Sequence, residues 1–288
     1  MAFKGEELEM SNVKSALTIA GTDPTGGAGI QADLKVFQER EVFGMSVVTS
    51  VVAQNTEGVR AVQHLDVSFI EQQLDAVLED ITPHAIKTGM IATVEMMELI
   101  ADKLKNNSIP YVIDPVMVAK SGDSLMDEKS RQVIRNTLIP LATVVTPNVP
   151  EAEILTGLKI ETQEEQRNAA KYIVEELGAK AAIVKGGHLT GEETEDILYT
   201  DGQFSSFYSK RFQTKHTHGT GCTFSAAITA ELAKGKSIEE ATSIGKDFIR
   251  DAIRYSLEIG KGNGPTNAWG LRLQGLPNKG ENSHATFN

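Results

Sequence analysis

A glycine-rich segment with one cysteine, residues 216–223 (HTHGTGCT), has the residue types needed to bind a phosphate group, and it precedes a predicted helix. A helix N-terminus presents unpaired amides, and its dipole favours an anion. We therefore expect Gly219, Thr220 and Gly221 to stabilise negative charge during phosphoryl transfer. Cys222 falls in the first helical turn, where a thiolate is stabilised and its pKa lowered. The competing interpretation is a small buried thiol that packs like an alanine.

A second glycine-rich segment, residues 21–29 (GTDPTGGAG), joins a predicted strand to a predicted helix. Four glycines in nine residues allow the backbone to approach a ligand closely. The spacing matches neither G-x-G-x-x-G nor G-x-x-x-x-G-K-[ST], so neither a Rossmann nor a P-loop site is indicated. A tight strand-to-helix turn explains the composition equally well.

Two further segments combine polar side chains with turns. Residues 148–151 (NVPE) predict a helix cap, with Asn148 as N-cap and Glu151 at the third helical position. The same glutamate, with Asp114 at another strand end, can also serve a magnesium–nucleotide site, because Mg²⁺ takes a few carboxylates beside phosphates. The two interpretations are compatible. Lys185, which precedes two glycines, can neutralise phosphate charge or can simply reach solvent from a strand end.

Short apolar runs alternate with longer amphipathic stretches, which predicts an α/β fold. The predicted strands are 16–20, 45–53, 84–88, 111–114, 142–146 and 181–185, then a hairpin of 197–199 and 204–208; the predicted helices are 30–40, 69–79, 95–105, 131–138, 164–177, 220–233 and 238–258. Mostly apolar strands predict a parallel sheet covered on both faces. Ligands of such sheets bind beyond the carboxyl ends of the strands. The segments described above are therefore expected to meet at one rim.

The composition is that of an ordinary globular protein and excludes several functional classes. Of 288 residues, 28 are basic and 39 acidic, and the net charge of −11 argues against nucleic acid and anionic lipid as partners. No apolar run approaches the roughly 18 residues of a membrane span. The first residues lack the apolar stretch of a signal peptide. The single cysteine excludes an intrachain disulfide and favours a cytoplasmic location.

Taken together, the segments resemble the ribokinase-like superfamily, and more narrowly the hydroxymethylpyrimidine and phosphohydroxymethylpyrimidine kinases of thiamine synthesis. The resemblance runs from about Ala16 to Trp269. It rests on seven motifs in order: ALTIAGTDPTGGAGIQADLK (16–35), VAQNT (52–56), KTGM (87–90), DPVMVAKSGD (114–123), TPN (146–148), KGGH (185–188) and HTHGTGCT (216–223).

The resemblance implies a fold, a domain division and a reaction. It implies a ribokinase-like α/β fold with a mostly parallel central sheet and helices on both faces. One kinase domain is expected at 15–270, with an N-terminal extension at 1–14 and a C-terminal tail at 271–288. Such enzymes transfer the γ-phosphoryl group of ATP to the hydroxymethyl group of 4-amino-5-hydroxymethyl-2-methylpyrimidine, and then phosphorylate the monophosphate to the diphosphate. ATP, Mg²⁺, a small pyrimidine substrate and a homodimer are therefore expected.

The resemblance also implies residue roles. Gly21, Asp33, Gln54 and Met90 are expected to bind the pyrimidine; Asn148, Lys185, Thr220 and Gly221 the nucleotide; Asp114 and Glu151 the magnesium ion; and Gly219, Thr220, Gly221 and Cys222 form the catalytic turn. Gln54 suits an aminopyrimidine because its amide donates and accepts hydrogen bonds at once. His218 is interpreted as a loop residue at the edge of this site.

Cys222 stands where the sugar kinases of the wider superfamily carry an aspartate base. The sequence leaves open whether its thiolate accepts the alcohol proton or only completes the anion-binding turn. In the second phosphorylation a phosphate oxygen attacks and needs little base help, so Cys222 is expected to matter less there. Two other functions stay open: a pyridoxal or pyridoxine kinase on the same scaffold, which Gln54 disfavours, and a non-catalytic metabolite sensor.

Overall fold

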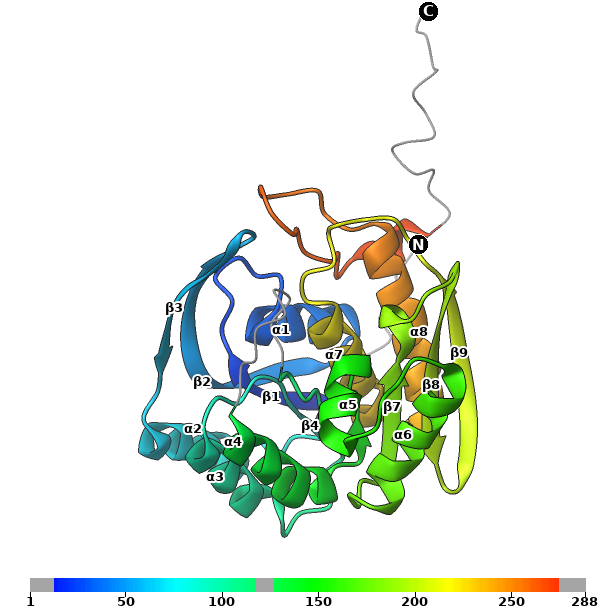
Figure 1. The fold of residues 1–288 in the computed structure, drawn as a ribbon. Coiled ribbons are helices and arrows are strands. Elements are labelled where there is room, and N and C mark those ends of the chain that lie inside the picture. Colours follow the sequence, from blue (N-terminus) through cyan, green and yellow to red (C-terminus); the bar gives the residue numbers. More distant parts are fainter. Residues whose placement is uncertain (1–12, 118–126, 275–288) are drawn as a thin grey trace, which may run out of the picture.

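A nine-stranded sheet runs through residues 13–117 and 127–274, the part of the chain that the computed structural model describes (Figure 1). The strands are β1 (Ser15–Gly21), β2 (Phe43–Asn55), β3 (Gly58–His64), β4 (Ala85–Thr88), β5 (Tyr111–Ile113), β6 (Val144–Val145), β7 (Ala181–Lys185), β8 (Glu193–Thr200) and β9 (Gln203–Lys210). The α-helices are α1 (Gly29–Glu39), α2 (Val67–Asp80), α3 (Val94–Leu104), α4 (Glu128–Val133), α5 (Val149–Thr156), α6 (Gln163–Glu175), α7 (Thr220–Ala233) and α8 (Ile238–Arg254).

The centre of the sheet is parallel, which confirms the predicted architecture. The strand order is β3-β2-β1-β4-β5-β6-β7-β8-β9, and every pairing from β2 to β7 is parallel. The outer strands β3, β8 and β9 pair antiparallel. Because the chain order reverses between β1 and β4, the carboxyl ends of these two strands form the crevice where sheets of this kind bind ligands.

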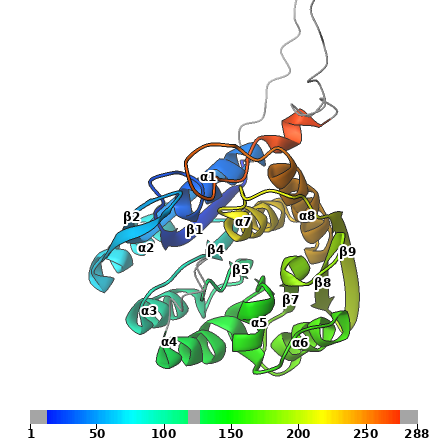
Figure 2. The same cartoon turned by 45° about the horizontal axis from the view of Figure 1, so that its top comes forward.

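Helices cover both faces of the sheet, as predicted. Successive residues of β1 point to opposite faces: Leu17 packs in one apolar cluster with Met97 of α3, and Ala16 packs in another with Phe37 of α1 and Phe224 of α7. Figure 2 shows α1, α7 and α8 above the sheet and α3 to α6 below it. This double cover explains why the central strands are mostly apolar.

The structure differs from the predicted elements at several places, among them β3 and the end of α8. β3 has no counterpart among the predicted strands, because all seven of its residues are exposed and it lacks an apolar face. It pairs with β2 across a turn in which Asn55 Oδ1 accepts hydrogen bonds from the amides of Glu57 and Gly58. Helix α8 ends at Arg254, before the predicted end at 258, and the chain then turns back toward β3.

The predicted boundaries at 15 and 270 stay predictions. β1 begins at Ser15, and a short 3₁₀ helix, η5 (Gly270–Leu273), follows the predicted domain end. In η5, Arg272 Nε lies 2.7 Å from Glu39 Oε2 of α1. Residues 1–12, 275–288 and 118–126, which include the end of the motif 114–123, lie outside the described residues. Within the described ranges, no helix combines the length and apolar character that crossing a membrane requires.

Candidate active site

The turn before α7 lies directly against the loop that follows β1. Gly219 has a φ of +77°, in the left-handed region, and no side chain caps the start of α7. A Cβ atom on Gly219 would overlap the carbonyl oxygen of Gly27. This position therefore needs glycine both for its conformation and for space. The uncapped first turn of α7 faces the β1 loop, so the two glycine-rich segments form one continuous surface.

Asp23 holds these two segments together, a role that we did not predict from the sequence. Its buried carboxylate accepts hydrogen bonds from the amides of Thr25, Gly27 and Ala28, at 2.9, 3.1 and 2.8 Å. His218 Nε2 lies 2.8 Å from Asp23 Oδ2. Burial by itself would raise the pKa of Asp23, but the hydrogen bonds, led by that of His218, hold this pKa well below its usual range. The Asp-Pro-Thr sequence at the end of a strand could have indicated this role, because aspartates in such turns accept hydrogen bonds from nearby backbone amides.

Three residues predicted at the pyrimidine end come together at the crevice between β1 and β4. A Cβ atom on Gly21 would lie 3.0 Å from Met90 Cε. The side chain of Gln54, from β2, lies close enough to Asp23 to help lower the pKa of that carboxyl group. The three predicted binding residues thus share one rim, while their contacts with a ligand stay a prediction.

Asp33 and Lys87 form an ion pair beneath this rim. Both side chains are fully buried, and Lys87 Nζ lies 2.9 and 2.8 Å from the two carboxylate oxygens of Asp33. Thr18 Oγ1 donates to the same carboxylate at 2.6 Å. Burial opposes the charge on Lys87, but the carboxylate of Asp33 outweighs it and holds the pKa of Lys87 above its usual range. Asp33 therefore balances a buried ammonium group, and a direct contact with the pyrimidine stays a prediction.

The pKa of Cys222 corrects one expectation. Burial raises the pKa of the thiol to about 12, although the charge of Lys87 and a hydrogen bond with the Gly29 backbone partly oppose this. The predicted lowering of this pKa by the helix N-terminus is therefore wrong. The free-energy cost of removing water from a thiolate is larger than the stabilisation that the partial charge of a helix end provides. The neutral thiol is therefore the favoured form of Cys222 at pH 7, although the residue as a whole is half-buried.

The ends of β5 and β7 bring a lysine and a carboxylate to the first turn of α7. Lys185 Nζ lies 3.3 Å from Asp114 Oδ1. A Cβ atom on Gly221 would lie 3.1 Å from Asp114 Oδ2 and 3.5 Å from Lys185 Nζ. The charge of Asp114 also acts on the Cys222 thiol. The residues predicted for the nucleotide, the metal ion and the catalytic turn are thus neighbours.

Asn148 and Glu151 form the predicted helix cap at the start of α5. The Glu151 amide donates to Asn148 Oδ1 at 2.9 Å, and the Asn148 amide donates to Glu151 Oε2 at 2.8 Å. Burial raises the pKa of Glu151 to about 7, against the opposing charge of Lys185. Among residues 13–117 and 127–274, no group of three or more His, Cys, Asp or Glu side chains is placed to hold a metal ion. The pair Asp114 and Glu151 still fits Mg²⁺, which takes other ligands from phosphates and water.

The loop after α8 fastens the β2–β3 hairpin over the rim. The amides of Gly262 and Asn263 donate to the side chain and carbonyl oxygens of Thr56, at 3.1 and 2.9 Å. The next amide, of Gly264, donates to His216 Nδ1 at 3.2 Å. This loop, orange in Figure 1, therefore connects the strand that carries Gln54 to the turn before α7. The glycines of this loop lie outside all seven motifs, so nothing in the sequence indicated that they contact the site.

A family model places these motifs among known proteins. The family described as phosphomethylpyrimidine kinase matches residues 23–267. A hydroxymethylpyrimidine/phosphomethylpyrimidine kinase of Staphylococcus aureus is 55% identical over 270 residues, which covers 93% of this chain and 98% of the relative.

Two solved structures share the fold. The ADP complex of Bacillus subtilis pyridoxal kinase is 43% identical, with a TM-score of 0.85 over 91% of this chain and 100% of that chain. A phosphomethylpyrimidine kinase of Clostridium difficile is also 43% identical, with a TM-score of 0.75 over 83% of this chain and 99% of that chain. With its mostly parallel sheet and its ordered motifs, the chain has the ribokinase-like fold and belongs to the phosphomethylpyrimidine kinase family.

Proposed function

We propose that this protein transfers the γ-phosphoryl group of ATP to 4-amino-5-hydroxymethyl-2-methylpyrimidine, and then phosphorylates the monophosphate to the diphosphate in the same site. The observation that carries the proposal is the meeting of the two glycine-rich segments at Gly219 and Gly27. This contact places an uncapped helix N-terminus beside the crevice that holds Gly21, Met90 and Gln54. A phosphoryl group in transit would then lie between an anion-binding turn and the acceptor.

The nucleotide end of the site is proposed to use Lys185, Asn148, Thr220 and Gly221. Lys185 brings a positive charge to the first turn of α7, where phosphate oxygens would gather. Asp114 and Glu151 would hold Mg²⁺, which when bound offsets phosphate charge. The ADP complex of the similar B. subtilis kinase supports nucleotide use.

Cys222 is proposed to accept the alcohol proton in its thiolate form. With a pKa of about 12, only a small fraction of the thiol is ionised at pH 7. Lys87 is the cationic group that favours this fraction. Attack by the monophosphate in the second step involves an oxygen that is already negatively charged. That step therefore has little need of the thiolate.

The pH dependence of the two steps tests this role. Because deprotonation supplies the base, we expect the alcohol step to accelerate about tenfold per pH unit between pH 7 and 9, while the second step stays nearly level. Cys222→Ala should remove this rise and slow the alcohol step more than the second step. The two steps are timed separately in quenched reactions at each pH. Equal losses in both steps, or a level profile for the alcohol, would contradict a base and leave Cys222 as a member of the turn.

Pyridoxal phosphorylation is the second candidate, and the likeness to the B. subtilis pyridoxal kinase favours it. Gln54 separates the two substrates because its amide can pair with the adjacent amine and ring nitrogen of an aminopyrimidine. A pyridine with a phenolic oxygen and an aldehyde lacks that edge. We therefore propose the pyrimidine as the preferred substrate.

Gln54→Leu is expected to raise the KM for the pyrimidine alcohol about tenfold, because the ring loses its paired hydrogen bonds. The KM for pyridoxal should change much less. Steady-state turnover on both alcohols measures the difference. Gln63→Leu, an exposed change on the neighbouring β3, is the control and should leave both KM values unchanged. An equal rise for both alcohols would show that Gln54 does not select the pyrimidine.

We also propose that the protein works in the cytoplasm as a homodimer. A single cysteine fits a reducing compartment. Val51, Val59 and Val62 on the β2–β3 edge are exposed and offer apolar surface to a second copy. Sedimentation velocity would measure the mass of the particle, and a monomer at assay concentrations would contradict the dimer.

A further inference from the structure

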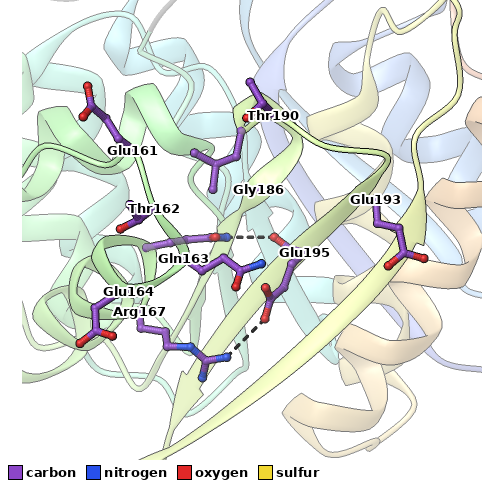
Figure 3. A pocket seen from close by; sticks show the side chains of 11 residues that line it. Glu161, Thr162, Gln163, Glu164, Arg167, Gly186, Thr190, Glu193 and Glu195 are labelled. Carbon is purple, nitrogen blue, oxygen red and sulfur yellow. Dashed lines mark hydrogen bonds and ion pairs between the residues drawn. The ribbon is translucent and has the colours of Figure 1, made fainter.

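A cavity of about 530 Å³ lies between the start of α6, the turn after β7 and β8 (Figure 3). It belongs neither to the crevice at β1 and β4 nor to the turn before α7. Four glutamates line it, Glu161, Glu164, Glu193 and Glu195, against a single arginine, Arg167. Its walls are therefore rich in hydrogen-bond acceptors and carry an excess of negative charge.

Gln166 lines this cavity and has an unpartnered side-chain oxygen. The residue is fully buried, and its Nε2 donates to the carbonyl oxygens of Val184, at 2.7 Å, and Glu195, at 3.0 Å. These two acceptors determine which end of the amide is the nitrogen. Gln166 Oε1 is left without any hydrogen-bond partner. A buried acceptor without a donor costs free energy, so the site gains from a donor supplied by a bound molecule.

Glu195 contributes a second buried acceptor. The residue is 6% exposed. Its Oε1 accepts from Arg167, at 3.3 Å, and from the Tyr208 hydroxyl, at 3.0 Å. Its Oε2 has no partner. Figure 3 shows Arg167 meeting Glu195, with Glu193 standing apart from them near the start of β8. The one arginine is thus already engaged with Glu195, and with Ser206 at 3.1 Å.

The start of α6 does not offer an anion site here. The Thr162 amide donates to Glu165 Oε2 at 2.9 Å, and the Glu165 amide donates to Thr162 Oγ1 at 3.3 Å. This capping box satisfies amides that could otherwise bind an anion. Glutamates in and before the first turn add negative charge to the same place. Both the charge and the unpaired atoms therefore select a ligand that is positive and that donates hydrogen bonds.

We propose that this cavity binds a small protonated amine, whose N–H groups donate to Gln166 Oε1 and Glu195 Oε2. The ammonium group supplies donors to both orphan oxygens and a charge that the surrounding glutamates offset. Gly186, which also lines the cavity, directly follows Lys185 of the proposed nucleotide site. A bound amine would therefore sit against the segment that carries this lysine.

The test is an amide NMR titration of the full chain with methylammonium chloride and, separately, with tetramethylammonium chloride. The two cations share a charge, but only the first has N–H donors. Saturable shifts at the amides of Gly186 and Glu195 are expected with methylammonium alone. No saturable shift, or the same shift with both cations, would overturn the proposal.

Three variants locate the binding, and each is first checked for retained ADP binding. Glu195→Gln removes the buried carboxylate and should weaken methylammonium about tenfold. Glu193→Gln, at the exposed edge of the cavity, leaves the buried contacts intact and should weaken methylammonium binding about twofold. This variant still tests the proposal if Glu195→Gln does not fold. Glu176→Gln, at the end of α6 outside the cavity, makes the same charge change and should have no effect. Equal affinity in all three variants would also overturn the proposal.

Discussion

Gly219→Ala is expected to lower kcat for both phosphoryl transfers about 100- to 1,000-fold, the loss typical of disturbed anion-stabilising donors. The new Cβ would overlap the Gly27 carbonyl oxygen, and a φ of +77° disfavours any L side chain. The turn before α7 then has to move away from the β1 loop. Its amides would no longer face the transferring group. Initial rates for the alcohol and for the monophosphate measure the loss.

Gly235→Ala is the matched control for this change. Gly235 follows the other end of α7 with a φ of +82°, but a Cβ there would meet nothing within 4 Å. The control therefore imposes the same backbone strain, about 1 kcal/mol, without the collision. It should lower the melting temperature and leave both rates unchanged. Rates in Gly219→Ala that match those of the control would show that the contact between the two loops is not needed for transfer.

Asp33→Asn is expected to lower the free energy of unfolding by about 3–5 kcal/mol, because it leaves the buried ammonium of Lys87 without a counter-charge. Both side chains are fully buried, so solvent cannot take the place of the carboxylate. Urea denaturation of the purified variant measures the change. Kinase activity should fall as well, since the pair lies beside Cys222.

A double substitution separates the loss of the pair from the loss of one partner. Asp33→Asn combined with Lys87→Met removes both charges and should recover much of the lost stability. Asp102→Asn breaks the exposed ion pair with Lys105 and should leave the urea midpoint unchanged. If the double variant is no more stable than Asp33→Asn alone, the unpaired lysine is not the source of the instability.

Hydrophobic pattern was sufficient to predict the parallel centre of the sheet, because strands buried on both faces are mostly apolar. β1 illustrates this, since all seven of its residues are buried. The same criterion could not find β3, whose residues are all exposed and whose place depends on pairing with β2. The burial of Lys87 could not be predicted either. A lysine within a strand pattern indicates a solvent-exposed side chain, and only the tertiary fold brings Asp33 next to it.

Residue roles were predictable where a motif carries local geometry, and less so where distant segments meet. The cap formed by Asn148 and Glu151 is local and was predicted from four residues. The thiol of Cys222 was expected to have a lowered pKa from its helix position, but surrounding burial raises it. The tie between Asp23 and His218 joins residues far apart in the sequence, and spacing alone could not reveal it.

One rim of the sheet is proposed to carry out both transfers, first to the pyrimidine alcohol and then to its monophosphate. Mass spectrometry of a reaction containing the purified protein, ATP, Mg²⁺ and 4-amino-5-hydroxymethyl-2-methylpyrimidine tests this proposal most directly. We expect the monophosphate to accumulate first and then to be converted to the diphosphate. The proposal is contradicted if no phosphorylated pyrimidine forms under conditions in which the same preparation binds ADP and phosphorylates pyridoxal.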